Sequence, residues 1–83
     1  MLEITLYTSK TCAPCHILSP RIKQLADSNP DKLSYIDVDI TTDNPLNIMG
    51  TPHIVIKREG QEIINEHVSN PAQTLNKIKE MIP

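Results

Sequence analysis

The chain has 83 residues, of which 39% are hydrophobic and 22% are charged, a length that fits one globular domain over residues 1–83 and leaves no room for a second. Eight basic against ten acidic side chains give a formal net charge of −2. Because the charges form no basic block and Tyr7 and Tyr35 are the only aromatic side chains besides histidine, we expect neither base stacking nor a nucleic-acid partner.

In the N-terminal part of the chain, the spacing of apolar residues changes from that of a strand to that of a helix. Leu2 to Tyr7 alternate apolar and other side chains, which predicts a half-buried strand. A helix is predicted from near Cys12 to the residue before Asp27, with Pro14 in its first turn. Its apolar stripe consists of Ile17, Leu18, Ile22, Leu25 and Ala26. Pro20 lies inside this helix and removes a backbone hydrogen bond, so we expect a bend there.

A second strand is predicted from Leu33 to Ile40. Ile36 and Val38 share one face of it, and Asp37 and Asp39 share the other, which we interpret as a solvated polar face. A strand, a helix and a strand in this order predict a right-handed parallel crossover.

The next segment, Thr41 to Gly50, is polar and turn-rich, and its Asn44-Pro45 pair is suited to cap one or two turns of helix. Two further strands are predicted over His53 to Lys57 and Glu62 to Val68. The connection between them is short and contains Gly60, which is typical of a hairpin.

A last helix is predicted to begin with Asn70 as its N-cap and Pro71 at the first helical position. Its apolar residues are Leu75, Ile78 and Ile82. The order of elements is therefore strand, helix, strand, short helical connection, strand, strand, helix, which indicates a mixed α/β domain.

Cys12 and Cys15 stand three positions apart where the first strand gives way to the first helix, and one helical turn brings such positions to the same side. A disulfide between them closes too short a loop to constrain the unfolded chain much, so chemistry explains the pair better than structure. At a helix N-terminus, Cys12 meets unpaired backbone N–H groups that favour thiolate over thiol. We expect Cys12 to attack a substrate disulfide and Cys15 to resolve the mixed disulfide.

The first residues of the chain lack a basic segment followed by an apolar run, and no stretch approaches about 18 apolar residues. We expect a cytoplasmic protein without membrane contact, where a reducing environment keeps the two cysteines available for dithiol chemistry. We also expect a monomer with no resident cofactor or metal.

Two segments carry a family resemblance. Cys12-Ala13-Pro14-Cys15, followed by Pro20, resembles the active-site helix of the thioredoxin superfamily, and Gly50-Thr51-Pro52 resembles its cis-proline turn. The resemblance covers nearly the whole chain and implies a thioredoxin-like fold, a minimal β-α-β-(α)-β-β-α core with a four-stranded mixed sheet. It implies that Pro52 is cis and faces the disulfide. The substrate-binding residues that it implies are Thr11, Ala13, Pro14, Thr51 and Pro52.

The resemblance also implies partners. Disulfide-containing proteins would be the substrates, reduced by dithiol exchange, and a thioredoxin-reductase-type flavoenzyme would supply the electrons. The alternative within the superfamily is a glutaredoxin-like, glutathione-dependent oxidoreductase, whose length this chain has. The Cys-Pro-Tyr-Cys and Gly-Gly segments typical of glutaredoxins are not found in the sequence.

Two positions depart from the thioredoxin pattern. Thr11 stands where thioredoxins usually carry Trp, and Leu6 stands where they carry a buried Asp. The usual proton acceptor for Cys15 is therefore expected to be missing. Candidates to replace it are His16, His53 and Tyr7, and candidates to tune the pKa of Cys12 are Lys10, His16 and His53.

Other chemistries of the cysteine pair stay open at this point. Cys12-Ala13-Pro14-Cys15-His16 matches the c-type haem attachment pattern, with Met49 or Met81 as an axial ligand. Zinc or a cluster is another possibility, with both cysteines as ligands. The further ligands would then be His16, His53 or His67, and the chain would be a non-enzymatic metal-binding or interaction module.

Overall fold

A computed structural model describes residues 1–82 of the chain. Its elements are β1 (Leu2–Thr8), α1 (Ala13–Ser28), β2 (Leu33–Asp39), β3 (His53–Arg58), β4 (Gln61–His67) and α2 (Pro71–Met81). The strands form one four-stranded sheet in the order β2-β1-β3-β4. β1 runs parallel to β2 and antiparallel to β3, and β4 runs antiparallel to β3. The mixed sheet and the parallel crossover are therefore confirmed.

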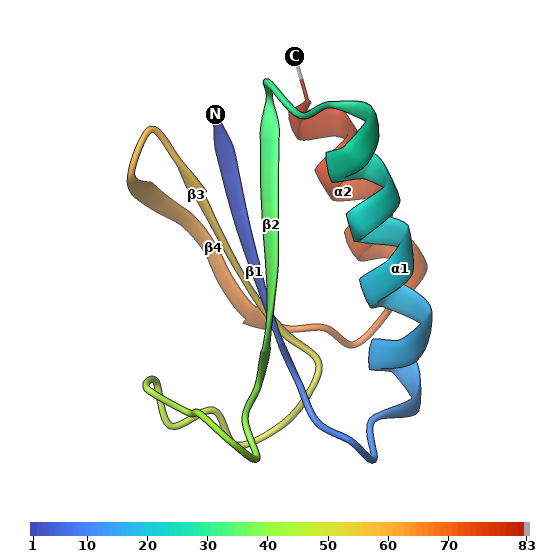
Figure 1. The fold of residues 1–83 in the computed structure, drawn as a ribbon, viewed down its shortest axis with the longest axis vertical. Helices are drawn as coiled ribbons and strands as arrows, with labels where there is room; N and C mark the ends of the chain where they lie inside the picture. Colours follow the sequence, from blue (N-terminus) through green and yellow to red (C-terminus); the bar gives the residue numbers. More distant parts are fainter. Residues whose placement is uncertain (83) are drawn as a thin grey trace.

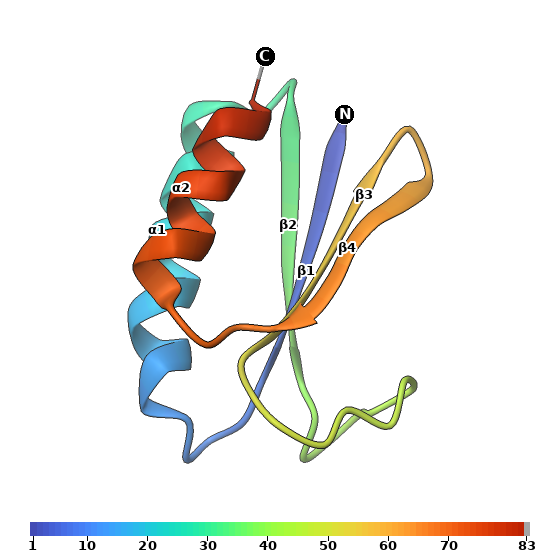
Figure 2. The ribbon, with the colours of Figure 1, turned by 180° about the vertical axis from the view of Figure 1, so that it is seen from behind.

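Both helices pack on one face of the sheet, as Figures 1 and 2 show from opposite sides. The core lies between the helices and the sheet. It consists of Leu2, Ile4, Leu6, Leu18, Ile22, Leu33, Ile54, Ile56, Val68, Leu75 and Ile78. Ile17 is not part of it and is 57% exposed, so its place in the helical stripe was predicted wrongly. One residue along a helix rotates a side chain by about 100°, which turns Ile17 away from the face on which Leu18 is buried.

The faces of β2 are the reverse of those that its pattern suggests. Leu2 is the register partner of Leu33, and Leu6 is the partner of Asp37, so Leu33 and Asp37 lie on the face that the helices cover. Ile36 lies on the other face and is 60% exposed. Alternation of side chains along a strand defines two faces but does not say which one is buried. Here the register with the buried residues of β1 determines which face of β2 the helices cover.

No helix forms over residues 41–50, so the predicted helical turns there are wrong. Asn44 instead closes a turn with its side chain, which accepts a hydrogen bond from the Ile48 amide at 2.7 Å and donates one to the Ile48 carbonyl at 3.0 Å. Asn47 has a φ of 53°, a left-handed conformation that interrupts a right-handed helix. Side-chain bonds of Asn to nearby backbone compete with helix formation.

The segment 41–50 extends over the sheet face that the helices leave open (Figures 1 and 2). Its Leu46 lines a hollow together with Tyr7 and Val55, whose side chains point to that face. Tyr7 is 7% and Val55 is 5% exposed, so this loop gives the second face of the sheet its partial cover.

Other predicted boundaries hold to within two residues, and α1 continues through Pro20 to Ser28. The connection between β3 and β4 places Glu59 at φ 52° and Gly60 at φ 78°, which is why a glycine is favoured there. The Asn70 side chain caps α2 by accepting a hydrogen bond from the Gln73 amide at 3.2 Å. In the described part of the chain, neither helix is long and apolar enough to cross a bilayer.

Candidate functional site

The two cysteines lie at the N-terminus of α1, where Cys12 is the N-cap and Cys15 is in the first turn. They form a disulfide with a Cα–Cα distance of 5.3 Å. The Cys12 sulfur also accepts a hydrogen bond from the backbone N–H of Cys15 at 3.2 Å. Pro14 occupies a position whose N–H the helix does not need. The first turn therefore holds both sulfurs on one side, with a backbone donor aimed at Cys12.

The two cysteine residues differ in accessibility. Cys12 is 7% exposed and Cys15 is 2% exposed. Thr11, Ala13 and Pro14, which surround Cys12 in the sequence, are all exposed. A sulfur that approaches from solvent therefore meets Cys12 before Cys15.

A turn from the middle of the chain is held against the start of α1. The peptide bond between Thr51 and Pro52 is cis. The Ser9 carbonyl accepts a hydrogen bond from the Cys12 amide at 3.2 Å, and the Ser9 and Thr51 hydroxyl oxygens are 3.0 Å apart. Pro52 is buried, and its carbonyl accepts a hydrogen bond from the Val68 amide at 2.8 Å. Thr51 is thereby linked to the backbone of Cys12 through one residue.

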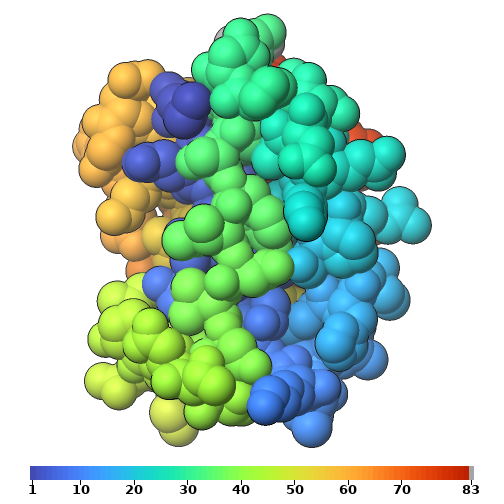
Figure 3. Space-filling model, viewed as in Figure 1, coloured from blue at the N-terminus to red at the C-terminus, as the bar shows by residue number. Residues whose placement is uncertain are grey.

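A hollow of about 210 Å³ opens beside Cys15, in the seam between α1 and the end of β2 (Figure 3). Its walls are Thr8, Ser9, Lys10, Cys15, His16, Ser19, Asp37 and Asp39. Two of the predicted tuning side chains, Lys10 and His16, thus reach the site, and both are exposed. The hollow therefore brings Cys15 beside polar side chains of α1 and β2.

Asp37 is anchored in this hollow from two elements. The Ser19 hydroxyl donates to its carboxylate oxygens at 3.0 and 2.9 Å, and the Tyr35 hydroxyl donates to Oδ1. Burial raises the pKa of Tyr35 well above its usual value, and the bond to Asp37 raises it further, so this hydroxyl stays a donor. Asp37 was predicted only as part of a solvated polar face and not as a site residue. No local sequence signal marks Asp37, because its place in the site follows from its pairing with Leu6 across a parallel ladder.

His53 lies elsewhere. It is the register partner of Tyr7, on the sheet face turned away from α1, with ring centroids 6.2 Å apart in an edge-to-face contact. Its Nε2 is 2.5 Å from the Asn65 Oδ1, and its cross-strand partner on β4 is His67. Neither His53 nor Tyr7 lines the hollow beside Cys15.

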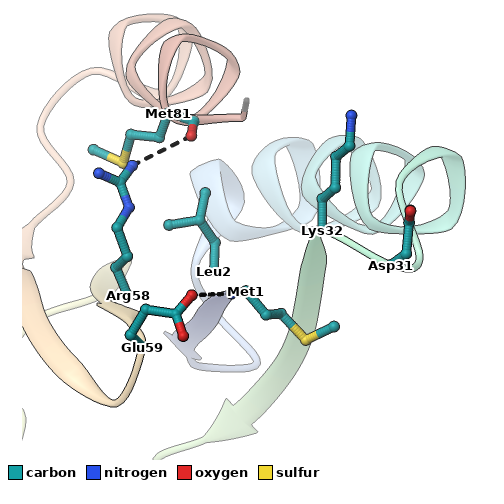
Figure 4. Close-up of a pocket in the computed structure, with 7 residues that line it drawn as sticks. All are labelled: Met1, Leu2, Asp31, Lys32, Arg58, Glu59 and Met81. Carbon is teal, nitrogen blue, oxygen red and sulfur yellow. Dashed lines mark hydrogen bonds and ion pairs between the residues drawn. The ribbon is translucent and has the colours of Figure 1, made fainter.

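Figure 4 shows a larger hollow, of about 520 Å³, where β1 begins and α2 ends. Within it the Met1 ammonium donates to Glu59 at 2.8 Å and Arg58 donates to the Met81 carbonyl at 3.3 Å. Because Cys12 follows the other end of β1, Met81 is at the wrong end of the domain to ligate a haem attached there. Among residues 1–82, no three or more His, Cys, Asp or Glu side chains are grouped to hold a metal.

Comparisons with known proteins agree with this geometry. The thioredoxin family model matches residues 2–82. NADPH-dependent thioredoxin reductase 3 of Arabidopsis thaliana is 36% identical over 53 residues, which cover 59% of this chain and 10% of that protein. This chain therefore spans about a tenth of the length of that curated relative.

Solved thioredoxins share the fold. The germline-specific thioredoxin Deadhead of Drosophila melanogaster superposes with a TM-score of 0.80 at 16% identity, covering 98% of this chain and 81% of that one. Thioredoxin O1 of Arabidopsis thaliana, in its oxidised state, superposes with a TM-score of 0.79 at 22% identity, covering 100% of this chain and 79% of that one.

Proposed function

This chain belongs to the thioredoxin family and carries the cysteine pair of a thiol–disulfide oxidoreductase, and from that premise we propose that it reduces disulfides in partner proteins. The observation that carries the proposal is the Cys12–Cys15 disulfide at the N-terminus of α1, with Cys12 as the more exposed cysteine. The oxidised pair is the form that such a reduction leaves behind.

The first step belongs to Cys12. In the reduced protein, the backbone N–H of Cys15 and the positive end of α1 stabilise a Cys12 thiolate. This thiolate attacks one sulfur of the substrate disulfide, so that a mixed disulfide forms, the substrate S–S bond breaks, and the second substrate sulfur leaves as a thiolate.

The second step belongs to Cys15. Its thiol loses a proton and its sulfur attacks the Cys12 sulfur, which forms the Cys12–Cys15 disulfide and breaks the bond to the substrate. The remaining substrate sulfur leaves as a thiolate and takes up a proton. The substrate has gained two electrons and the protein dithiol has lost them.

Substrate docking is proposed to use the exposed residues around Cys12. Thr11, Ala13 and Pro14 are exposed next to Cys12 in the chain, and the turn at Thr51 is linked to the Cys12 backbone through Ser9. Met49, just before that turn, is 96% exposed. A flexible, polarisable Met side chain adapts to irregular apolar surfaces, which suits a carrier that meets several proteins.

A pair of cysteine variants tests the proposal. Cys15→Ser keeps the nucleophile and removes the resolving sulfur, so it is expected to accumulate mixed disulfides with a model substrate such as insulin. Cys12→Ser removes the nucleophile and is expected to accumulate none. Non-reducing electrophoresis with mass spectrometry reads both outcomes. Equal trapping by both variants, or trapping by neither, contradicts the proposal.

The electron donor is proposed to be a thioredoxin-reductase-type flavoenzyme. The support is the similarity to a protein named as a thioredoxin reductase and the Pro14 of a thioredoxin-like pair. Insulin reduction with NADPH and a thioredoxin reductase is expected to exceed reduction with glutathione and its reductase. Full turnover with glutathione alone would favour the glutaredoxin-like alternative.

The working compartment and the assembly state complete the proposal. A dithiol that must be recharged after each turnover suits a reducing compartment such as the cytoplasm. We place the protein there as a monomer, and sedimentation of the reduced and oxidised forms is expected to give a 9.3 kDa species. A stable dimer in both redox forms contradicts this part of the proposal.

A further inference from the structure

Cys15 needs a proton acceptor before it can attack Cys12, and the apolar side chain of Leu6, 0% exposed on the neighbouring strand, offers none. We propose that Asp37 accepts this proton, through water in the hollow beside Cys15. The inference rests on the proposed function and assigns a proton acceptor to its second step.

The position of Asp37 on β2 and that of Cys15 on α1 bring the two residues to the same hollow. Asp37 is the register partner of Leu6 and lies on the face that α1 covers. Ser19, whose hydroxyl donates to both Asp37 carboxylate oxygens, is one helical turn after Cys15 on α1 and therefore on the same side of the helix. Cys15, Ser19 and Asp37 border one hollow.

The hollow has room for the proton path. Its volume is about 210 Å³. A water molecule takes up about 30 Å³ in the liquid, so several fit. Asp37 itself is exposed, so a proton that it receives passes on to bulk solvent and the carboxylate is ready for the next turnover.

The other ionisable groups around the hollow suit the role less well. Lys10 is a donor only. The Thr41 hydroxyl and backbone N–H, at 2.6 and 2.9 Å, hold the pKa of Asp39 below its usual value, with Lys10 adding to the effect, so its carboxylate is a weaker base. Tyr35 remains protonated because its pKa is raised. His16 is the remaining rival, exposed at the rim.

In this step the Cys15 S–H bond breaks and its proton passes through water to a carboxylate oxygen of Asp37. The Cys15 sulfur forms the bond to the Cys12 sulfur, and the substrate sulfur leaves with the electron pair of the mixed disulfide. The hydrogen bonds that the Ser19 and Tyr35 hydroxyls donate to Asp37 orient its carboxylate.

The test is stopped-flow decay of the mixed disulfide between the reduced protein and a disulfide-bonded peptide, from pH 6 to pH 9. Asp37→Asn keeps the size of the side chain and removes the base. Its decay is expected to be slower than wild type by about tenfold or more at pH 6 to 7, because general base catalysis is lost. The difference is expected to shrink toward pH 9, where the Cys15 thiol ionises without help.

Asp39→Asn is the matched control, since it removes the same charge from the same hollow, and it is expected to decay like wild type. Asp37→Glu is expected to restore part of the rate. The formation phase, which belongs to Cys12, is expected to be the same in all variants and shows that each is folded.

Two results overturn the inference while leaving the proposed function intact. The first is wild-type decay in Asp37→Asn at every pH, in which case slow decay of His16→Gln would assign the role to His16. The second is equal slowing of decay in Asp37→Asn and Asp39→Asn. A wild-type protein that forms no mixed disulfide gives a different result, since it contradicts the proposed function and the inference with it.

Discussion

The hydroxyl oxygens of Ser9 and Thr51 are 3.0 Å apart although 42 residues separate them in the chain. Ser9 also accepts the backbone hydrogen bond of Cys12 at 3.2 Å. This side-chain contact thus ties the turn that carries Pro52 to the backbone at the start of α1.

This contact predicts an energetic coupling between Ser9 and Thr51. Ser9→Ala, Thr51→Val and the double variant are expected to show a coupling of about 0.5–1.5 kcal/mol in the free energy of unfolding of the oxidised protein, the net value of a typical hydrogen bond. Urea denaturation measures it. Additive effects of the two substitutions would show that the hydroxyls do not stabilise one another.

The accessibility of the two cysteine residues predicts their reactivity. In the reduced protein, Cys12 is expected to react with iodoacetamide at neutral pH well before Cys15, because Cys12 is the N-cap and the more exposed of the two. Mass spectrometry of peptides after a brief pulse measures the ratio. The same pulse on urea-unfolded protein is the control and should label both equally. Preferential labelling of Cys15 in the folded protein would reverse the roles.

The burial of Leu6 predicts the cost of placing a carboxylate there. Leu6→Asp is expected to lose about 3–5 kcal/mol in the free energy of unfolding at neutral pH, since the charge would be buried and beside Asp37. Leu6→Asn is the control for polarity without charge.

The two Leu6 variants are expected to differ in pH dependence. The introduced carboxyl would have a raised pKa in the folded state, so its stabilising contribution is present at low pH and is lost as the pH rises. Urea denaturation from pH 3.5 to 7 should therefore show Leu6→Asp falling below Leu6→Asn as the pH increases. Parallel curves would show that the side chain escapes to solvent.

The raised pKa of Tyr35 predicts a second pH dependence. The folded state holds its proton where the unfolded state releases it, so the stabilisation is complete below about pH 10, the usual tyrosine value, and is lost as the pH rises above it. Between pH 9 and pH 11 the free energy of unfolding of Tyr35→Phe is expected to fall less steeply than that of wild type. Tyr7→Phe is the control, and an equal change in slope for both would contradict the assignment.

Much of the fold follows from local sequence. Alternation on β1, Asn70 as a cap, Gly60 in the hairpin and the helical spacing of Leu18 and Ile22 each depend on neighbours within a few residues. These features were predicted close to where the structure has them, because local backbone preferences and periodicity are what a single sequence records.

The parts that were predicted wrongly depend on strand register or on specific side-chain bonds, which hydrophobic periodicity does not record. Which face of β2 is buried is decided by its register with β1, and Asp37 becomes a site residue through that register and through Ser19 on α1. The turn of Asn44 replaces helix because its side chain bonds to Ile48, a choice that propensity alone does not make. Strand alternation alone did not say on which face of the sheet the His53 side chain lies. Its pairing with Tyr7 places it on the face turned away from α1.

The shared hollow of Met1 and Met81 shows that the chain enters and leaves the domain at one end, while Cys12 lies at the opposite end of β1 (Figures 1 and 4). A tether attached at either terminus would therefore run away from the reactive sulfur. An attachment at either terminus, whether to a surface, to another polypeptide or to a linker, would leave the end of the domain that carries Cys12 free to meet a substrate.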